Sequence, residues 1–119
     1  MNKLHNIIWA VEDGIREVKY AYQRVVNGYD ERILWDIAEY LNRVLIPVLK
    51  KFRENKYGYP NGLTQKAWDK ELDIMIKGFE ASQRIKDLNP GTRDSYRNDM
   101  KIAEKGLSLF AKRYMNLWD

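Results

Sequence analysis

Residues 64–85 read TQKAWDKELDIMIKGFEASQRI, and this stretch decides the expected fold. Its large apolar side chains recur every three or four positions, which is the spacing that places residues on one face of an α-helix. The members of this face are Trp68, Leu72, Met75, Ile76 and Phe79. Thr64 is suited to cap the helix, because its hydroxyl can accept a hydrogen bond from an unpaired amide of the first turn. We therefore expect a helix from Thr64 to about Ile85 with one buried face.

Three other stretches carry the same helical spacing. Their apolar positions are Leu4, Ile8, Val11, Ile15, Val18, Tyr22 and Val25 in the first; Leu34, Ile37, Leu41, Val44, Leu45, Val48 and Phe52 in the second; and Tyr96, Met100, Ala103, Leu107, Phe110, Tyr114 and Leu117 in the last. No stretch alternates apolar and polar residues over a convincing length, so we expect essentially no β-sheet.

Helix-ending and helix-capping residues separate the four predicted helices. In chain order they are Asn27-Gly28, a cap at Asp30, the cluster of Gly58, Pro60 and Gly62, the break at Asn89-Pro90-Gly91, and a cap at Thr92. Glycine accepts the left-handed conformation that closes a helix, and proline cannot continue one. Because these connections are short, neighbouring helices are expected to run antiparallel.

The fold predicted from these patterns is all-α: a four-helix antiparallel bundle in which each helix buries its apolar face, formed by residues 1–119 as a single domain. Pro47 lies inside the second helix and removes one backbone hydrogen-bond donor. Either this helix kinks near Arg43 to Pro47, or two shorter helices meet there. The apolar spacing continues to Phe52, which favours the kink.

The composition restricts the classes of protein. The chain has 119 residues, no cysteine, 21 basic and 17 acidic residues, and a net charge of +4. Disulfides and thiolate metal sites are therefore excluded, and the interspersed charges are typical of solvated helix faces. The longest apolar stretch without acidic or basic residues runs from Leu4 to Val11, far short of the roughly 20 residues that span a bilayer. We expect a protein of the cytoplasm that does not cross a membrane.

Catalytic and metal-binding patterns are absent from the sequence. It contains none of the phosphate-binding, dinucleotide-binding, zinc-protease or serine-hydrolase motifs. His5 is the single histidine and has no evident partner for a triad. Asp69, Asp73 and Glu80 could line one helical ridge as metal ligands, but di-metal bundles add Glu-x-x-His pairs that do not occur here. Asp36 and Asp69, each beside a tryptophan, fit capping better than acid/base chemistry. We expect no enzymatic activity, no metal and no cofactor.

The candidate binding site is the turn KYGYPNG at residues 56–62, where aromatic and basic residues gather. The residues assigned to ligand or partner binding are Lys50, Lys56, Tyr57, Tyr59 and Trp68. Aromatic rings can stack on a base or anchor a partner, and lysines can neutralise acidic groups. The alternative is structural: the lysines are solvated near a helix C-terminus, which favours cations, and the tyrosines cover the end of the bundle.

Aromatic and turn residues between positions 35 and 119 form a further pattern. It comprises Trp35, Pro47, Leu49-Lys50, Phe52, Gly58-Tyr59-Pro60, Leu63-Thr64, Trp68-Asp69, Leu72-Asp73, Met75-Ile76, Phe79-Glu80, Gly106-Leu107, Leu109-Phe110, Tyr114 and Leu117-Trp118-Asp119. In these residues the chain resembles a family of small accessory proteins encoded by tailed bacteriophages and prophages. Residues 1–30 lie outside the resemblance. It implies action in the bacterial host cytoplasm and supplies no catalytic residues to carry over.

Three functions follow as hypotheses. The first is a non-enzymatic phage accessory protein that binds a host component, for example blocking a defence protein or sequestering a nucleotide signal. The second is sequence-independent nucleic-acid binding through the basic surface, which predicts steep weakening with added salt. The third is a structural or assembly role, in which the apolar stripes of the first and last helices form a homo-oligomer.

Overall fold

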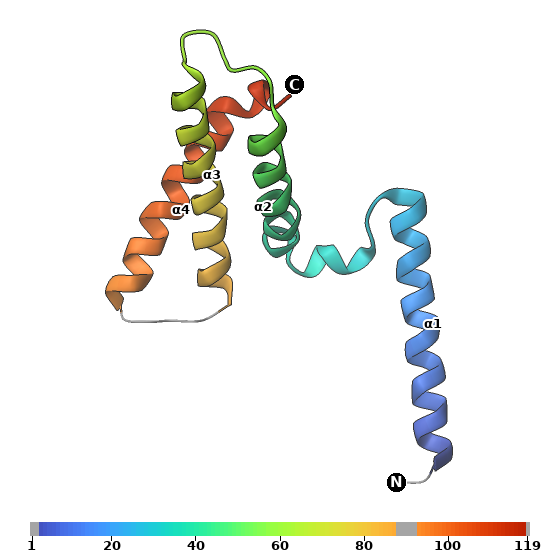
Figure 1. The fold of residues 1–119 in the computed structure, drawn as a ribbon. Helices are drawn as coiled ribbons and strands as arrows, with labels where there is room; N and C mark the ends of the chain where they lie inside the picture. Colours follow the sequence, from blue (N-terminus) through green and yellow to red (C-terminus); the bar gives the residue numbers. More distant parts are fainter. Residues whose placement is uncertain (1–2, 88–92, 119) are drawn as a thin grey trace. The chain divides into compact units, whose positions relative to one another are not determined.

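The computed structural model describes residues 3–87 and 93–118, and within these ranges it contains four α-helices, two short 3-10 helices and no strand (Figure 1). The elements are α1 (Lys3–Asn27), η1 (Glu31–Trp35), α2 (Ile37–Asn55), α3 (Gln65–Lys86), α4 (Arg93–Arg113) and η2 (Tyr114–Asn116). The prediction of an all-α chain with four helices is confirmed. The break at Asn89-Pro90-Gly91, the cap at Thr92 and residue Asp119 lie outside the described residues.

The chain divides into two compact units, Met1–Ile37 and Ala38–Asp119. We describe each unit by itself. None of the helices in the described ranges combines the length and the apolar composition needed to cross a bilayer.

The first unit consists of α1 and η1. Gly28 has φ 83° and its amide donates to the carbonyl of Arg24 at 3.0 Å, so α1 ends where the sequence predicts. Asp30 is a cap, but of η1 and not of the second α-helix, because its carboxylate accepts from the amide of Arg32 at 3.0 Å. Asp36 closes η1, because its amide donates to the carbonyl of Ile33, and α2 begins only at Ile37. The expected second helix is thus preceded by a separate short turn of 3-10 helix.

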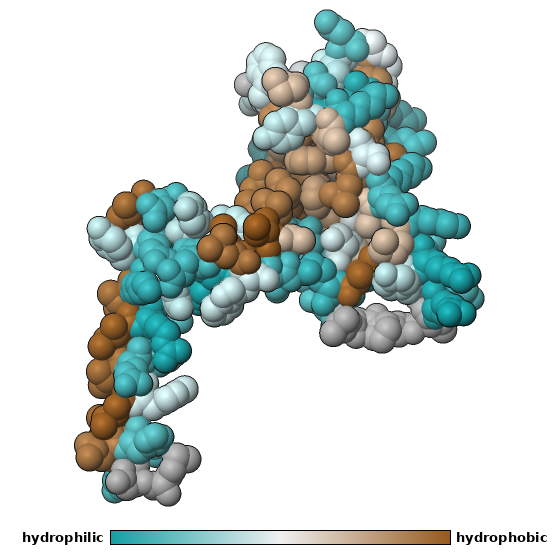
Figure 2. All heavy atoms as spheres, turned by 180° about the vertical axis from the view of Figure 1, so that it is seen from behind, coloured by the Kyte–Doolittle hydropathy of each residue, from teal (hydrophilic) through white to brown (hydrophobic). Residues whose placement is uncertain are grey.

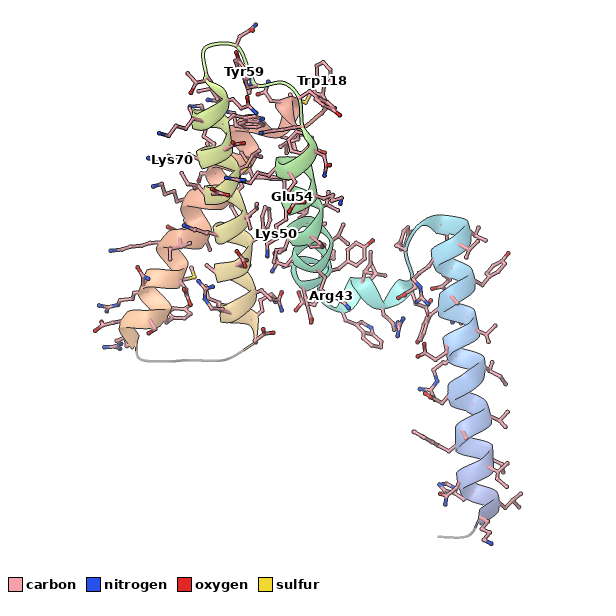
Figure 3. The ribbon with its side chains drawn as sticks, viewed as in Figure 1. Arg43, Lys50, Glu54, Tyr59, Lys70 and Trp118 are labelled. Carbon is pink, nitrogen blue, oxygen red and sulfur yellow. The ribbon has the colours of Figure 1, made fainter. Side chains whose placement is uncertain are left out.

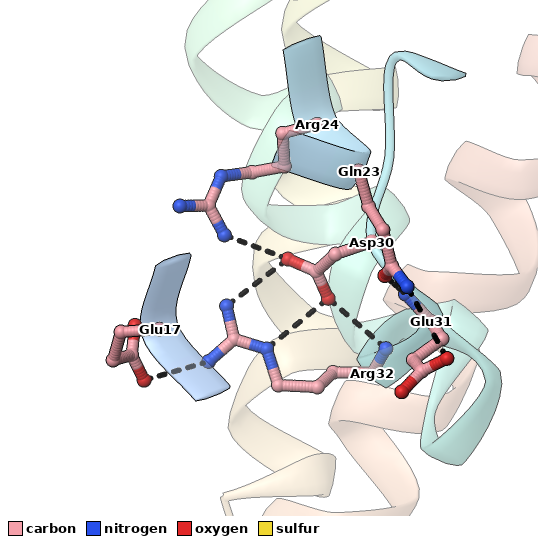
Figure 4. Close-up of polar contacts among 6 residues, drawn as sticks. All are labelled: Glu17, Gln23, Arg24, Asp30, Glu31 and Arg32. Atoms are coloured by element: carbon pink, nitrogen blue, oxygen red, sulfur yellow. Dashed lines mark hydrogen bonds and ion pairs between the residues drawn. The ribbon is translucent and has the colours of Figure 1, made fainter. Parts of the chain in front are cut away.

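Polar contacts hold η1 on the polar side of α1 (Figure 4). The buried carboxylate of Asp30 accepts from Arg24 Nη1 at 2.8 Å and from Nε and Nη2 of Arg32 at 3.1 and 3.0 Å. Lys19 Nζ donates to Glu31 at 3.0 Å. These charge-assisted bonds use residues of α1 outside its apolar stripe. Accordingly α1 contributes no buried residue, contrary to the expectation that every helix buries its apolar face.

The second unit contains the hydrophobic core. Its buried members are Leu49 of α2 and Trp68, Leu72, Met75, Ile76 and Phe79 of α3, with Leu45, Ile46, Phe52, Leu63, Leu109, Phe110 and Leu117 packed around them. The five α3 residues are those predicted to face inward. The N-cap at Thr64 is confirmed too, since its hydroxyl accepts from the amide of Ala67 at 3.1 Å. Pro47 lies inside α2, which continues as one helix from Ile37 to Asn55.

A glycine pair sets the contact between α3 and α4. A Cβ placed on Gly78 would lie 2.6 Å from the Cα of Gly106, and one on Gly106 would lie 2.8 Å from the carbonyl oxygen of Ile74. Only residues without a side chain allow this approach. The buried residues of α4 are therefore Ala103 and Gly106, while Leu107 of the predicted stripe remains exposed. The face of α4 that packs inward is rotated from the predicted one.

We expect Gly78→Ala to lower the free energy of unfolding by about 1–3 kcal/mol, because the new methyl group must push two backbones apart. The effect opposes the gain of about 1 kcal/mol that alanine brings to an open helical site. Gly14→Ala in α1 is the control, since nothing lies within 4 Å of a Cβ there. Denaturant unfolding followed by circular dichroism measures both variants. An unchanged or raised stability of Gly78→Ala would contradict the close approach.

The Asp30 cluster predicts a local response to acid. Hydrogen bonds from the Arg32 side chain, then from Arg24, hold the pKa of the Asp30 carboxyl well below its ordinary value of 3.8. Because the pKa is lower in the folded state, the stabilisation is present above pH 3.8 and is lost as the pH falls below it. Carbon NMR of Asp30 should show an ionised carboxylate persisting below that pH, and Asp30→Asn should remove the acid sensitivity of the Arg32 amide. Titration at the ordinary value would contradict the cluster.

Candidate functional site

One end of the second unit brings together two segments that are distant in sequence. Helices α3 and α4 run antiparallel, as the ion pairs Arg84–Asp99 at 2.8 Å and Arg113–Glu71 at 2.8 Å show near their two ends. The chain after α4 therefore returns to the loop between α2 and α3. In Figure 3 the labelled side chains of Tyr59 and Trp118 lie at this same end.

A cavity of about 390 Å³, here called the end cavity, lies between these segments. It is lined by Gly58, Tyr59, Pro60, Asn61, Trp68, Asn116 and Trp118. The loop is held by a turn in which the Leu63 amide donates to the Pro60 carbonyl at 3.1 Å, and Gly62 supplies the φ of 87° that the turn requires. Trp68 is 1% exposed and is fixed by an edge-on contact with Phe52, with ring centroids 6.4 Å apart.

The lining of the end cavity is uncharged. Tyr59 and Trp118 are 54% and 76% exposed, so their rings remain accessible beside the buried ring of Trp68. The side-chain amides of Asn61 and Asn116 supply hydrogen-bond donors and acceptors. The volume falls within the range of about 300–1,000 Å³ that is usual for ligand sites. Rings and amides without charge suit a flat, neutral group that stacks and forms hydrogen bonds.

The structure separates the five residues that the sequence assigned to one site. Tyr59 and Trp68 line the end cavity, whereas Tyr57 is 91% exposed and lies outside its lining. Lys56 is buried and forms an ion pair with Asp69. Lys50 pairs with Glu80 at 3.6 Å. Neither lysine is among the residues that line the cavity.

These two lysines belong to an ion-pair ladder that joins α3 to α2 and to Lys56 just after α2, and the order of the pairs shows that α2 and α3 run antiparallel. Its pairs are Lys56–Asp69, Arg53–Asp73 and Lys50–Glu80. The acidic ridge that could have held a metal is thus paired with cations. Across residues 3–87 and 93–118 the structure has no group of three or more His, Asp or Glu side chains placed to hold a metal ion.

Five lining residues were not among those assigned to the site from the sequence: Gly58, Pro60, Asn61, Asn116 and Trp118. The first three belong to the turn at residues 56–62, and Asn116 and Trp118 lie outside it. Trp118 could have been assigned to the site from the predicted topology of the bundle. In an up-down-up-down arrangement, the end of the fourth helix returns to the connection between the second and third. A tryptophan after the last helix should then lie beside the turn at residues 56–62.

No family model matches the chain, and no curated protein and no solved structure is significantly similar to it.

We expect Lys56→Met to lower the free energy of unfolding by about 1–3 kcal/mol, because it leaves the Asp69 carboxylate without its buried cation. The matched control is Lys50→Met. Its pair with Glu80 is half exposed, and such pairs contribute about 0–1 kcal/mol. Denaturant unfolding of both variants gives the comparison. Equal effects of the two substitutions would show that Lys56 has no special structural role, and Lys56→Met/Asp69→Leu should recover part of the loss.

Proposed function

We propose that this chain is a non-enzymatic binding protein that receives a flat, uncharged group of its partner in the end cavity. The observation that carries the proposal is the lining, in which accessible rings of Tyr59 and Trp118 and two amides surround the fixed ring of Trp68. Large aromatic residues in a pocket are the usual anchors of protein interfaces. The core and the ion-pair ladder keep Trp68 in place, so binding costs little conformational entropy at this side chain.

The charge of the site supports a protein partner over a nucleotide messenger. A phosphorylated ligand needs cations, and the two lysines assigned to that role are engaged with Asp69 and Glu80. For the same reason nucleic-acid binding has less support. The resemblance to phage accessory proteins gives the setting: the bacterial host cytoplasm, where the protein would bind and block a host component such as a defence protein. This action would be stoichiometric and not catalytic.

The test compares two tyrosines that lie two positions apart. Wild-type protein purified from a bacterial host is examined by native mass spectrometry, together with Tyr59→Ala and Tyr57→Ala. We expect a retained host component on the wild type and on Tyr57→Ala, and its dissociation constant should rise at least about tenfold in Tyr59→Ala. Trp118→Ala should also raise this dissociation constant.

The outcomes are distinct. Equal retention by Tyr59→Ala and the wild type, with both proteins folded by circular dichroism, would show that the end cavity is not the binding site. Loss of the retained component in Tyr57→Ala, but not in Tyr59→Ala, would show that the binding site is on the outer face of the loop. A retained nucleotide or nucleic acid in place of a protein would overturn the choice of partner, and steep loss of binding with salt would identify the nucleic acid.

A further inference from the structure

An unpartnered apolar stripe runs along α1, the helix that the proposed binding site does not use. Its residues are Leu4, Ile8, Val11, Ile15, Val18, Tyr22 and Val25, and their exposed fractions run from 49% at Ile8 to 85% at Val25. Figure 2 shows this stripe as a continuous band of apolar side chains along the helix. Contiguous exposed apolar surface of this kind marks an interaction site. Because η1 is bonded to the polar side of α1, it leaves the stripe uncovered.

The spacing of the stripe specifies a helical partner. The steps alternate strictly between four and three residues, which is the 3.5-residue period of a coiled coil. Ile8, Ile15 and Tyr22 occupy the a positions of this heptad, and Leu4, Val11, Val18 and Val25 occupy the d positions. The line of a and d residues is here called the seam. A partner helix with the same period packs against the seam by inserting its own side chains between these residues.

The flanking charges favour a second copy of α1 in antiparallel orientation. Glu12 and Lys19 occupy successive e positions. In an antiparallel pair, e positions face e positions, and Glu12 of each copy then lies opposite Lys19 of the other. In a parallel pair these two residues would face Ile7 and Gly14, so no opposite charges would meet. Charges beside the seam set orientation in this way.

We propose that α1 pairs with α1 of a second copy as an antiparallel coiled coil that joins two molecules into a dimer. In this register Val11 packs against Ile15 of the second copy, Ile8 against Val18 and Leu4 against Tyr22. Lys19 already donates to Glu31 at 3.0 Å, but its ammonium has three donors and can also bond Glu12 of the second copy. The dimer carries two end cavities, which raises avidity for a multivalent partner.

The charge of α1 argues against a membrane surface as the occupant. Helices that lie on anionic lipid carry a strongly basic polar face. α1 has four basic residues, Lys3, Arg16, Lys19 and Arg24, against three acidic ones, Glu12, Asp13 and Glu17. The two signs are mixed, with an excess of one positive charge (4 − 3 = 1). The same mixture suits pairing with its own copy, because each acidic group finds a basic one.

The first test measures the mass of the full chain in solution by sedimentation equilibrium. We expect a dimer for the wild type and a rise of about 100-fold or more in its dissociation constant for Ile15→Asp, which buries a charge in the seam of both copies. Asn6→Asp is the matched control, because it adds the same carboxylate on the polar side of α1, and it should remain dimeric. A monomeric wild type, or a dimer unaffected by Ile15→Asp, would overturn the proposal. Binding of the wild type to anionic lipid vesicles without self-association would do the same.

The second test determines whether the two copies of α1 run antiparallel or parallel. It does not require a variant with a buried charge to fold. The sequence has no cysteine, so single cysteines report only the introduced position. Val11→Cys and Ile15→Cys proteins are mixed and oxidised, and the cross-linked species are weighed. The antiparallel register predicts the mixed Val11→Cys/Ile15→Cys product. Products that join two identical variants would indicate a parallel pair and would overturn the register.

Discussion

The close approach of Gly78 and Gly106 is the constraint on which the second unit depends. With 2.6 Å between a hypothetical Cβ and the opposite Cα, α3 and α4 can meet only backbone to backbone. This contact fixes which face of α4 turns inward, and it brings Phe110 against Phe79 with ring centroids 5.1 Å apart. The end of α4 is thereby placed beside the loop between α2 and α3. The end cavity exists because the helices that carry its two walls are locked at their crossing.

In the second unit, the paired charged side chains stabilise the packing of the helices more than they serve ligand binding. Lys50 and Lys56 read in sequence as cations that could neutralise acidic groups of a ligand, yet they are paired with Glu80 and Asp69. A lysine can be buried only when an acidic group balances it, so the burial of Lys56 follows from the position of Asp69 on α3. The end cavity, in contrast, is lined by rings and amides without charge. This is why we propose recognition at the end cavity by stacking and not by charge.

Some elements of the fold could be predicted from local sequence patterns, and others could not. The buried face of α3 and its cap at Thr64 depend on neighbouring residues, and both were correct. The start of the second helix was wrong, because Asp30 satisfies the amide of Arg32 in a 3-10 turn and periodicity cannot distinguish that turn from a longer helix. Of the residues that line the end cavity, Tyr59 and Trp68 were named as candidates from the sequence. The burial of Lys56 was not predicted, since it depends on a partner 13 positions away.

Helices α1 and α3 differ in a way that the sequence already contains. The apolar face of α3 includes the adjacent residues Met75 and Ile76, which makes it wide enough to contact helices on two sides, as a globular core requires. Through its middle, α1 carries only a and d residues flanked by Glu12 and Lys19, which makes a narrow seam for one helix. A periodicity search counts both as amphipathic helices. The width of the face, and not its period alone, distinguishes a helix that completes a core from one that pairs with a single partner.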